Sequence, residues 1–306
     1  MSAPSLAPLT ALDDLAVLTV TGADAADFLH RQLSNDVLHL GPAQARWAAY
    51  CTAQGRMLAN VVVWRPAEDR ILMMVSRDIA QAFAKRLSMF VLRAKAQVTL
   101  ADDLQVLGCL LGPEAPDELK AQPWLRVPDA QGDWISAAAA AGSTPRAWRV
   151  VEAGQTLDPG ANQAAWRVAD IQAGLPWIRT GTQDLFIPQT LNMDLNGGID
   201  FKKGCYPGQE IIARSHYRGT VKRRMARGST PWANSLALPQ AGADLYIAQG
   251  DGRPAGRIID LAHDGQTLYL LAERSLGDAD TSGYSLGGAK GPVIELFPVD
   301  PAAPAA

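Results

Sequence analysis

The nine residues at 202–210, Lys-Lys-Gly-Cys-Tyr-Pro-Gly-Gln-Glu, place a thiol among cations, an amide and a carboxylate. A thiol beside ammonium groups and ahead of a helix N-terminus ionises more easily than a free one, and residues 208–217 have the pattern of a short helix. Cys205 is therefore a candidate nucleophile, with Lys203 as the cation that would favour its ionised form. The other motif residues would shape the loop or orient a ligand by hydrogen bonds: Gly204, Tyr206, Gly208, Gln209 and Glu210.

A second interpretation of Cys205 is a small buried side chain in a strand-to-helix loop, which is the commoner role of a lone cysteine. Apolar neighbours would suffice for burial, whereas Lys202 and Lys203 are unsuited to it. We therefore favour the reactive thiol. No metal site is predicted, because metal-ligand spacing is absent from the histidines His30, His39, His216 and His263.

Candidate ligand contacts precede the motif on irregular backbone. Trp177 follows Gly-Leu-Pro at 174–176, which should interrupt regular secondary structure. Gln189 and Asn192 lie in the segment Phe-Ile-Pro-Gln-Thr-Leu-Asn at 186–192. Interdomain packing for the tryptophan, and caps or turns for the two amides, explain these residues equally well.

Basic residues are concentrated around the motif. Seven lysines and arginines lie between positions 202 and 224, against the single acid Glu210. Such a patch could attract the anionic tail of a cofactor, with Arg214 as a contact, or a phosphate backbone. A solvated surface is an equally good interpretation.

The composition is that of an ordinary soluble chain. Its 306 residues are 48% hydrophobic and 19% charged, and a formal charge of −3 gives no general case for a nucleic-acid or membrane binder. Three distant cysteines form no disulfide framework. The first basic residue is Arg31, which argues against a secretory or transit peptide, and the apolar runs are strand-sized. We expect a cytoplasmic bacterial protein without a membrane span.

Hydrophobic periodicity predicts an α+β arrangement. The expected elements of the first part are a strand at 16–21, a helix at 25–33, a hairpin of strands at 46–52 and 57–64, a strand at 71–76, a helix at 78–91 and a strand at 96–100. Another apolar run at 104–111, a predicted strand at 148–152 and a predicted helix at 162–174 follow. From residue 219, short strands separated by turns predict a small all-β unit, most simply a barrel.

Residues 203–210, Lys-Gly-Cys-Tyr-Pro-Gly-Gln-Glu, resemble the signature of the YgfZ family, the folate-binding proteins of iron–sulfur cluster maintenance. Other segments resemble landmarks of that family in the family's order, from about residue 10 to the C-terminal unit. They are FLHRQLSNDV at 28–37, QGR at 54–56, AGLP at 173–176, FIPQTLN at 186–192 and GIDFK at 198–202.

The resemblance implies the fold of the related aminomethyltransferase of the glycine cleavage system, in which three domains form a ring around a hole that holds tetrahydrofolate. On that model, residues 1–41 and 103–218 form a discontinuous folate-binding α+β domain. Residues 42–102 form a ferredoxin-like domain, and residues 219–306 form the C-terminal β-barrel.

Two departures from the transferase pattern bear on activity. Where that family has an acidic pair with its catalytic aspartate, this chain has Ala59-Asn60, so aminomethyl transfer lacks its acid/base residue. The pterin-binding glutamate corresponds to Gln172, whose neutral amide should hold a pterin less firmly than a carboxylate. Whether the protein is an enzyme stays open, and a standard aminomethyltransferase is disfavoured.

The resemblance implies an accessory protein that binds tetrahydrofolate or a one-carbon derivative and supports assembly or repair of iron–sulfur clusters in client enzymes, including tRNA-modifying ones. Cys205 would act at the mouth of the folate hole, with cofactor contacts from Gln172, Trp177, Gln189, Asn192 and Arg214. One alternative is a folate-dependent one-carbon transferase. Another is an RNA-binding adaptor that uses the basic stretch.

Overall fold

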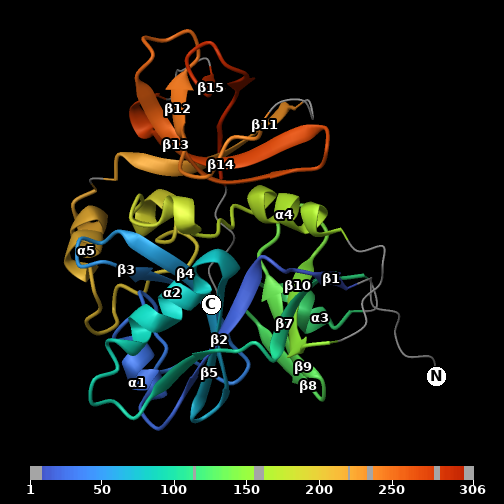
Figure 1. The fold of residues 1–306 in the computed structure, drawn as a ribbon, viewed down its shortest axis with the longest axis vertical. Helices are drawn as coiled ribbons and strands as arrows, with labels where there is room; N and C mark the ends of the chain where they lie inside the picture. The colour runs from blue at the N-terminus through green and yellow to red at the C-terminus, as the bar shows by residue number, and fades with distance from the viewer. Residues whose placement is uncertain are drawn as a thin grey trace.

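The structure, a computed structural model, describes residues 9–112, 115–154, 162–219, 221–232, 237–278 and 283–299. Two antiparallel five-stranded sheets form one end of the molecule, and a seven-stranded C-terminal sheet forms the other (Figure 1). The α+β class predicted from periodicity is confirmed.

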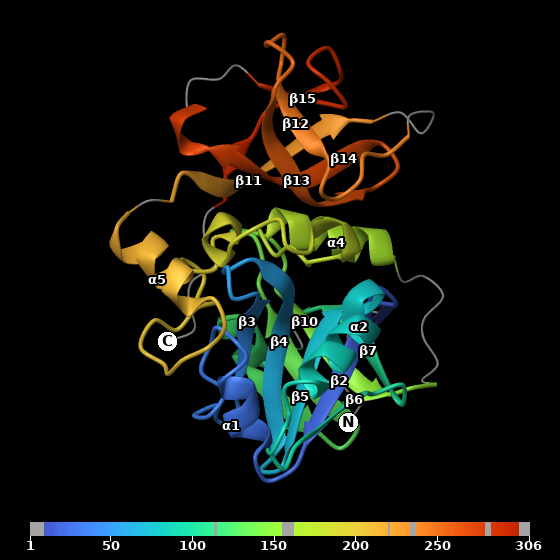
Figure 2. The ribbon, with the colours of Figure 1, turned by 60° about the vertical axis from the view of Figure 1, so that its left-hand side comes forward.

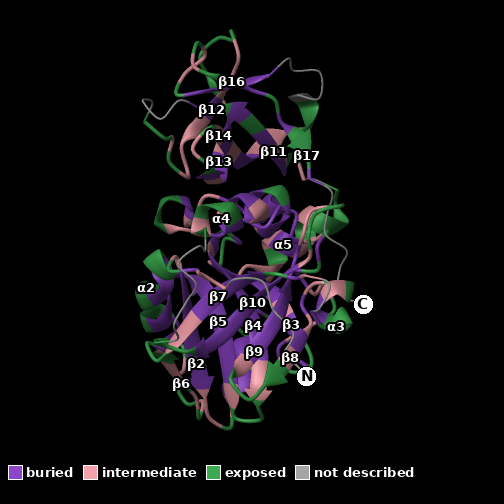
Figure 3. Ribbon diagram, turned by 90° about the vertical axis from the view of Figure 1, so that its right-hand side faces the viewer, coloured by how far each residue is buried: buried purple, intermediate pink, exposed green. Residues whose placement is uncertain are grey.

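The first sheet contains the predicted hairpin. Its strand order is β3 (Ala45–Cys51), β4 (Met57–Ala67), β5 (Arg70–Ser76), β2 (Leu15–Thr21) and β6 (Gln97–Leu100). Helix α2 (Arg77–Ser88) packs on this sheet through Ile79, Phe83 and Leu87, which recur at helical spacing on one face. The two strands of the hairpin are mostly buried, as Figure 3 shows for β4.

The limits of this sheet differ from the predicted domain boundary at residue 42. Strand β2 lies before that boundary, yet it pairs with β5 on one side and β6 on the other. Helix α1 (Ala25–His30) also ends three residues before the predicted position, because Leu33 forms an isolated bridge with Tyr50 of β3. The first sheet therefore contains strands from both sides of residue 42.

The second sheet combines one strand that precedes the first sheet in the chain with four strands that follow it. Its order is β1 (Thr10–Ala11), β7 (Leu104–Leu110), β10 (Arg146–Glu152), β9 (Gly132–Ala137) and β8 (Arg126–Asp129), with helix α3 (Asp117–Ala121) beside it. A cluster of five tryptophans lies in the core shared by the two sheets. It consists of Trp47, Trp124, Trp148, Trp166 and Trp177.

The C-terminal sheet is curled into a half-barrel, where the sequence predicted a barrel. Its order is β16 (Val293–Ile294), β15 (Tyr284–Leu286), β12 (Asp244–Ile247), β13 (Pro254–His263), β14 (Thr267–Ser275), β11 (Arg223–Pro231) and β17 (Phe297–Pro298). A short 3-10 turn, η3 (Leu276–Asp278), follows β14. Residues such as Leu268, Leu270 and Ala272 alternate inward and form a separate core.

Helix α4 (Gln163–Gln172) lies between the half-barrel and the other two sheets (Figure 2). The Asn162 side chain caps it by accepting hydrogen bonds from the amides of residues 164 and 165. Arg167 of α4 binds Asp14 at 2.6 Å and Asp260 of β13 at 2.7 Å. Because one partly buried guanidinium pairs with both carboxylates, these contacts join the half-barrel to the rest of the chain.

The segment between α4 and the half-barrel is largely irregular. It contains two 3-10 turns, η1 (Thr180–Thr182) and η2 (Pro188–Leu191), and then helix α5 (Gln209–Tyr217). Helix α5 lies beside the β3–β4 hairpin (Figure 2), because Gly208 at its start contacts Gly55 at the tip of the hairpin. This segment carries the motif that the sequence singled out.

Candidate functional site

Cys205 is the accessible thiol of the chain. Its residue is exposed, whereas Cys51 and Cys109 are buried, with 2% and 1% of their surface accessible. Burial raises the pKa values of both Cys51 and Cys109, which suits inert thiols. The structure therefore favours the exposed loop cysteine over the alternative of a buried small side chain.

Lys203 holds the motif loop against the end of α1. Its ammonium donates hydrogen bonds to the carbonyls of His30 and Leu33, the latter at 2.8 Å, and lies 4.8 Å from the Tyr206 ring centroid. Burial lowers the pKa of Lys203 to about 8. No hydrogen bond to Cys205 is found for it among the described residues, so its charge acts on the thiol only from a distance.

Gly208 is fixed by contact with the tip of the β3–β4 hairpin. It has a φ of +82°, and a Cβ there would lie 2.5 Å from the Thr52 carbonyl oxygen and 2.7 Å from the Gly55 Cα. Only glycine tolerates both the left-handed backbone and this approach. The contact explains why the motifs at 54–56 and 203–210 occur together, since each supplies one of the two glycines.

The remaining motif residues shape the turn into α5. The Gln209 side-chain oxygen accepts a hydrogen bond from the Tyr206 amide at 3.2 Å, and Tyr206 itself is buried. Glu210 is exposed in the first turn of α5, where a negative charge suits the helix dipole. Gly204 is exposed beside Cys205. These residues hold the thiol on a fixed loop.

A cavity of about 610 Å³, the thiol cavity, opens beside Cys205. It is lined by α1 and the motif loop, through Asp27, His30, Arg31, Leu38, Gly204, Cys205, Tyr206 and Pro207. The sequence did not predict that His30 lines a cavity with Cys205. It lies in the landmark segment at 28–37, but nothing in its spacing from Cys205 indicates that the two are neighbours.

The five predicted cofactor residues do not lie in one site. Trp177 is fully buried against Trp47, Gln189 donates to the Ile212 carbonyl, and Arg214 is exposed on α5. Asn192 lines a cavity of only about 10 Å³, the central cavity, together with Gly174 and with Met225 of β11. Its side-chain oxygen has no hydrogen-bond partner among the described residues.

Val299, the last residue that the structure describes, packs against the central cavity. Val299 is 9% exposed and lines the central cavity, and a Cβ on Gly174 would lie 2.3 Å from its side chain. A space of about 10 Å³ is no larger than one water molecule needs. The central cavity is therefore too small for a cofactor with Val299 in place.

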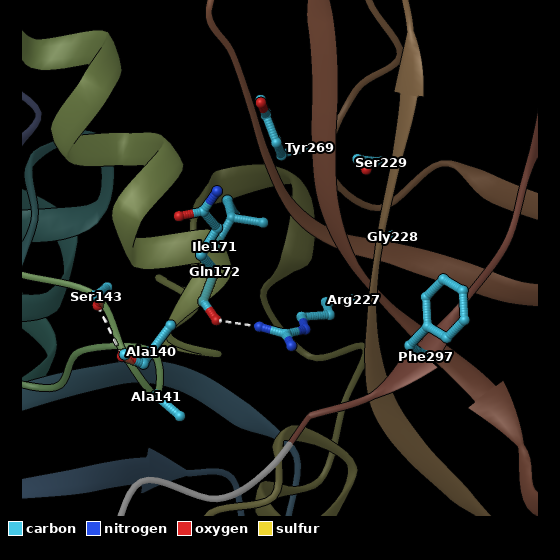
Figure 4. Close-up of a pocket in the computed structure, with 11 residues that line it drawn as sticks. Ala140, Ala141, Ser143, Ile171, Gln172, Arg227, Gly228, Ser229, Tyr269 and Phe297 are labelled. Atoms are coloured by element: carbon cyan, nitrogen blue, oxygen red, sulfur yellow. Dashed lines mark hydrogen bonds between the residues drawn. The ribbon is translucent and has the colours of Figure 1, made fainter.

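Gln172 lines a larger space, the interdomain cavity of about 380 Å³. Figure 4 shows it between the end of α4, the loop at 140–143 and the half-barrel. Arg227 of β11 projects into it and donates to the Gln172 carbonyl at 2.9 Å, and Tyr269 and Phe297 add aromatic rings. The interdomain and thiol cavities share no lining residue.

Comparison with known proteins places the chain in a family. A family model described as the GCVT N-terminal domain matches residues 7–139. The "tRNA-modifying protein YgfZ" of Enterobacter sp. (strain 638) is 32% identical over 300 residues, which cover 90% of this chain and 88% of that protein. This chain belongs to the YgfZ family. The YgfZ protein of Klebsiella pneumoniae (strain 342) is also 32% identical, over 86% of this chain and 85% of its own.

The fold of this YgfZ family member is that of an aminomethyltransferase. The glycine cleavage aminomethyltransferase T of Bartonella henselae superposes with a TM-score of 0.69 over 96% of this chain and 86% of its own, at 17% identity. The predicted fold is confirmed. None of the helices in the described ranges is long and apolar enough to cross a membrane, and no group of three metal-binding side chains occurs there.

Asn60 shows what replaces the transferase acid in this YgfZ family member. It is fully buried, its amide nitrogen donates to the Pro176 carbonyl at 2.7 Å, and its oxygen accepts from the Ile178 amide at 2.8 Å. Both hydrogen-bonding groups of the side chain therefore hold the irregular segment at 176–178. This is a structural arrangement, and Asn60 lines neither the thiol cavity nor the interdomain cavity.

Proposed function

We propose that this YgfZ family member acts in tRNA modification as an accessory protein, by assembling or repairing iron–sulfur clusters in client enzymes with Cys205 as its working group. The observation that carries the proposal is the exposed Cys205 on a loop fixed by Lys203 and Gly208, beside a cavity. Clusters take cysteine thiolates as ligands, commonly four. A single accessible thiol suits brief contact with a client's cluster or cluster ligand.

The experiment is complementation of a bacterial strain that lacks its own YgfZ. Cys205→Ala should leave the fold intact, because the side chain is exposed, and should abolish recovery of iron–sulfur enzyme activity and of tRNA modification. Cys109→Ala, a change of a buried thiol in the same chain, is the matched control and should complement. Full complementation by Cys205→Ala would exclude the reactive-thiol function.

We further propose that a reduced folate binds in the interdomain cavity. Its volume of about 380 Å³ lies in the range of ligand pockets, and the exposed side-chain amide of Gln172 can hydrogen-bond a pterin. The Arg227 guanidinium suits a carboxylate tail, and Tyr269 and Phe297 suit aromatic contacts. When bound, a reduced folate supplies or accepts a one-carbon unit. A larger hollow of about 680 Å³, lined by Trp47, Trp124 and Lys202, contains none of the predicted cofactor residues.

Tetrahydrofolate titration tests this assignment. Gln172→Ala removes one neutral hydrogen bond and should weaken binding roughly 2- to 10-fold, and Arg227→Gln removes a charged contact and should weaken it about 10-fold or more. The controls are Gln266→Ala and Arg253→Gln, exposed residues of the half-barrel away from this cavity. Equal affinities for all four variants and the wild type would place the folate elsewhere.

An RNA-binding adaptor is the second candidate, and one surface feature favours it. The Phe201 and His216 rings stack at 3.9 Å between centroids, and the 73% exposed Tyr217 packs at their edge. Arg214 and Arg218 flank Tyr217 on α5, and both are exposed. Stacked rings among cations are the means by which proteins hold single-stranded nucleic acid.

Retention of tRNA at increasing salt tests the adaptor. Tyr217→Ala should weaken retention about 5-fold or more, whereas Phe90→Ala, which removes an exposed ring in the turn after helix α2, should not. Absence of tRNA retention at low salt would eliminate this candidate, because electrostatic binding is strongest there.

A further inference from the structure

A histidine and a carboxylate lie beside the thiol that the proposed function uses. His30 is the last residue of α1, and it lines the thiol cavity together with Cys205. The His30 Nδ1 lies 3.0 Å from the Asp36 Oδ1, and the Leu38 amide donates toward the same nitrogen over a longer 3.4 Å. An ionised carboxylate can only accept a hydrogen bond, so the shorter contact assigns the proton to Nδ1. The Nε2 atom is left with its lone pair.

The free Nε2 points toward the motif loop. It lies 3.7 Å from the position that a Cβ would occupy on Gly204, the residue directly before Cys205. Consecutive Cα atoms are about 3.8 Å apart, and an exposed cysteine can change its side-chain rotamer freely. The Cys205 sulfur is not hydrogen-bonded to the imidazole in the described structure, but a rotation about one bond changes its position within the shared cavity.

We propose that His30 is the base that removes the proton from Cys205, and that Asp36 positions the imidazole for this step. The proposal rests on Cys205 being the working group of the proposed function. In the step the S–H bond breaks and a bond forms between that proton and Nε2, which leaves a thiolate beside an imidazolium. No electrons are transferred. The Asp36 carboxylate then stabilises the imidazolium through Nδ1–H, as the third group does in other nucleophile–base pairs.

The charges around His30 suit a base that is neutral before the reaction. Burial and the nearby Lys203 lower the pKa of His30, although Asp36 opposes them. Burial alone would raise the pKa of Asp36, but hydrogen bonds from His39 and the charge of Arg46 hold it at about 2, so this group is ionised. The other charged groups in the surroundings are Asp27 and Arg31 on α1, which pair with each other, and Asp200 near Lys203.

The pH dependence of Cys205 alkylation tests the proposal. The purified full chain is treated with iodoacetamide from about pH 5.5 to 9.5, and modified cysteines are assigned by mass spectrometry. His30→Gln keeps a polar side chain but removes the base, so the rate at pH 7 should fall about 10-fold and the midpoint of the profile should rise by about one pH unit. Asp36→Asn should move the profile in the same direction by less.

His39→Gln is the matched control, because His39 also contacts Asp36, at 2.8 Å, but does not line the thiol cavity. Its profile should match that of the wild type. Cys51 and Cys109 must stay unmodified in each variant, which verifies the fold, and His30→Asn replaces His30→Gln if that variant fails this test.

Superposition of the His30→Gln and wild-type profiles would overturn the proposal, and so would an equal shift in His39→Gln. Neither result affects complementation by Cys205→Ala. The failure of this inference and the failure of the proposed function are therefore distinguishable.

Discussion

The replacement Asn60→Asp restores the residue type of the transferase at nearly constant size, and the structure predicts that it harms this protein. The Asn60 amide nitrogen donates to the Pro176 carbonyl at 2.7 Å in a fully buried site. An ionised aspartate cannot donate, so two oxygens would face each other without a proton between them. A protonated aspartate can donate, which restores the hydrogen bond. The variant should therefore keep its proton when folded.

The cost of keeping that proton depends on pH. An ordinary aspartate has a pKa of about 3.9, and each pH unit above it adds about 1.4 kcal/mol, which gives roughly 4 to 5 kcal/mol at pH 7.5 if the folded site stays protonated. If the new carboxyl group ionises in the buried site instead, the unpaired charge costs about 3 to 5 kcal/mol. By either route the variant should lose about 4 kcal/mol of its free energy of unfolding at pH 7.5. At pH 4.5 it should be about 1 kcal/mol, because the unfolded chain is then only partly ionised.

Urea unfolding of variant and wild type at pH 4.5 and 7.5 measures this difference. The sign follows from proton binding: the folded variant holds the proton more tightly than the unfolded one, so its stability relative to the wild type falls as pH rises. Gln97→Glu makes the same amide-to-carboxyl change at an exposed position and should change stability by less than about 0.5 kcal/mol at both pH values. An equal loss for Asn60→Asp at both pH values would refute the reasoning.

Two further predictions concern the motif loop. In urea titration, Gly208→Ala should lower the free energy of unfolding by roughly 3 kcal/mol or more, because it adds a clash with the Thr52 carbonyl to an unfavourable φ. Gly142 also has a positive φ, of +74°, but nothing lies within 4 Å of an added Cβ, so Gly142→Ala should lower the free energy of unfolding by only about 1 kcal/mol. The pKa of Lys203 is lowered to about 8, so the folded protein binds its proton less tightly than the unfolded chain, and the wild type should gain stability relative to Lys203→Met as pH rises from 7.5 to 10. A stability difference between these two proteins that stays constant over that range would contradict the buried-ammonium assignment.

Local elements of this fold could be predicted from sequence, because their signals are local. The hairpin at 46–64 and the helix at 78–91 are found close to the predicted limits, as β3, β4 and α2. The placement of β2 between β5 and β6 could not be predicted. Strand pairing depends on partners far along the chain, and alternation within the strand at 16–21 gives no information about which partners it has.

The motif loop was predictable as a site but not in its geometry. The residue types around Cys205 indicate a reactive thiol, yet they also suggest that Lys203 acts directly on it. In the structure the Lys203 ammonium binds two carbonyls at the end of α1 instead. Similarly, sequence position on irregular backbone did not reveal that Trp177 points into the core while Gln172 faces a cavity. Side-chain direction in such segments is set by tertiary packing.

The contact between Gly55 and Gly208 also has a consequence for the order in which the protein folds. The two glycines are about 150 positions apart in the chain, so forming this contact closes a long loop and has the entropic cost of a non-local contact. During synthesis the hairpin tip emerges well before the segment that will cover it. Gly55 and the α1 wall of the thiol cavity are therefore already synthesised when Cys205 emerges, and the thiol takes its place beside them only after residues 203–210 have docked.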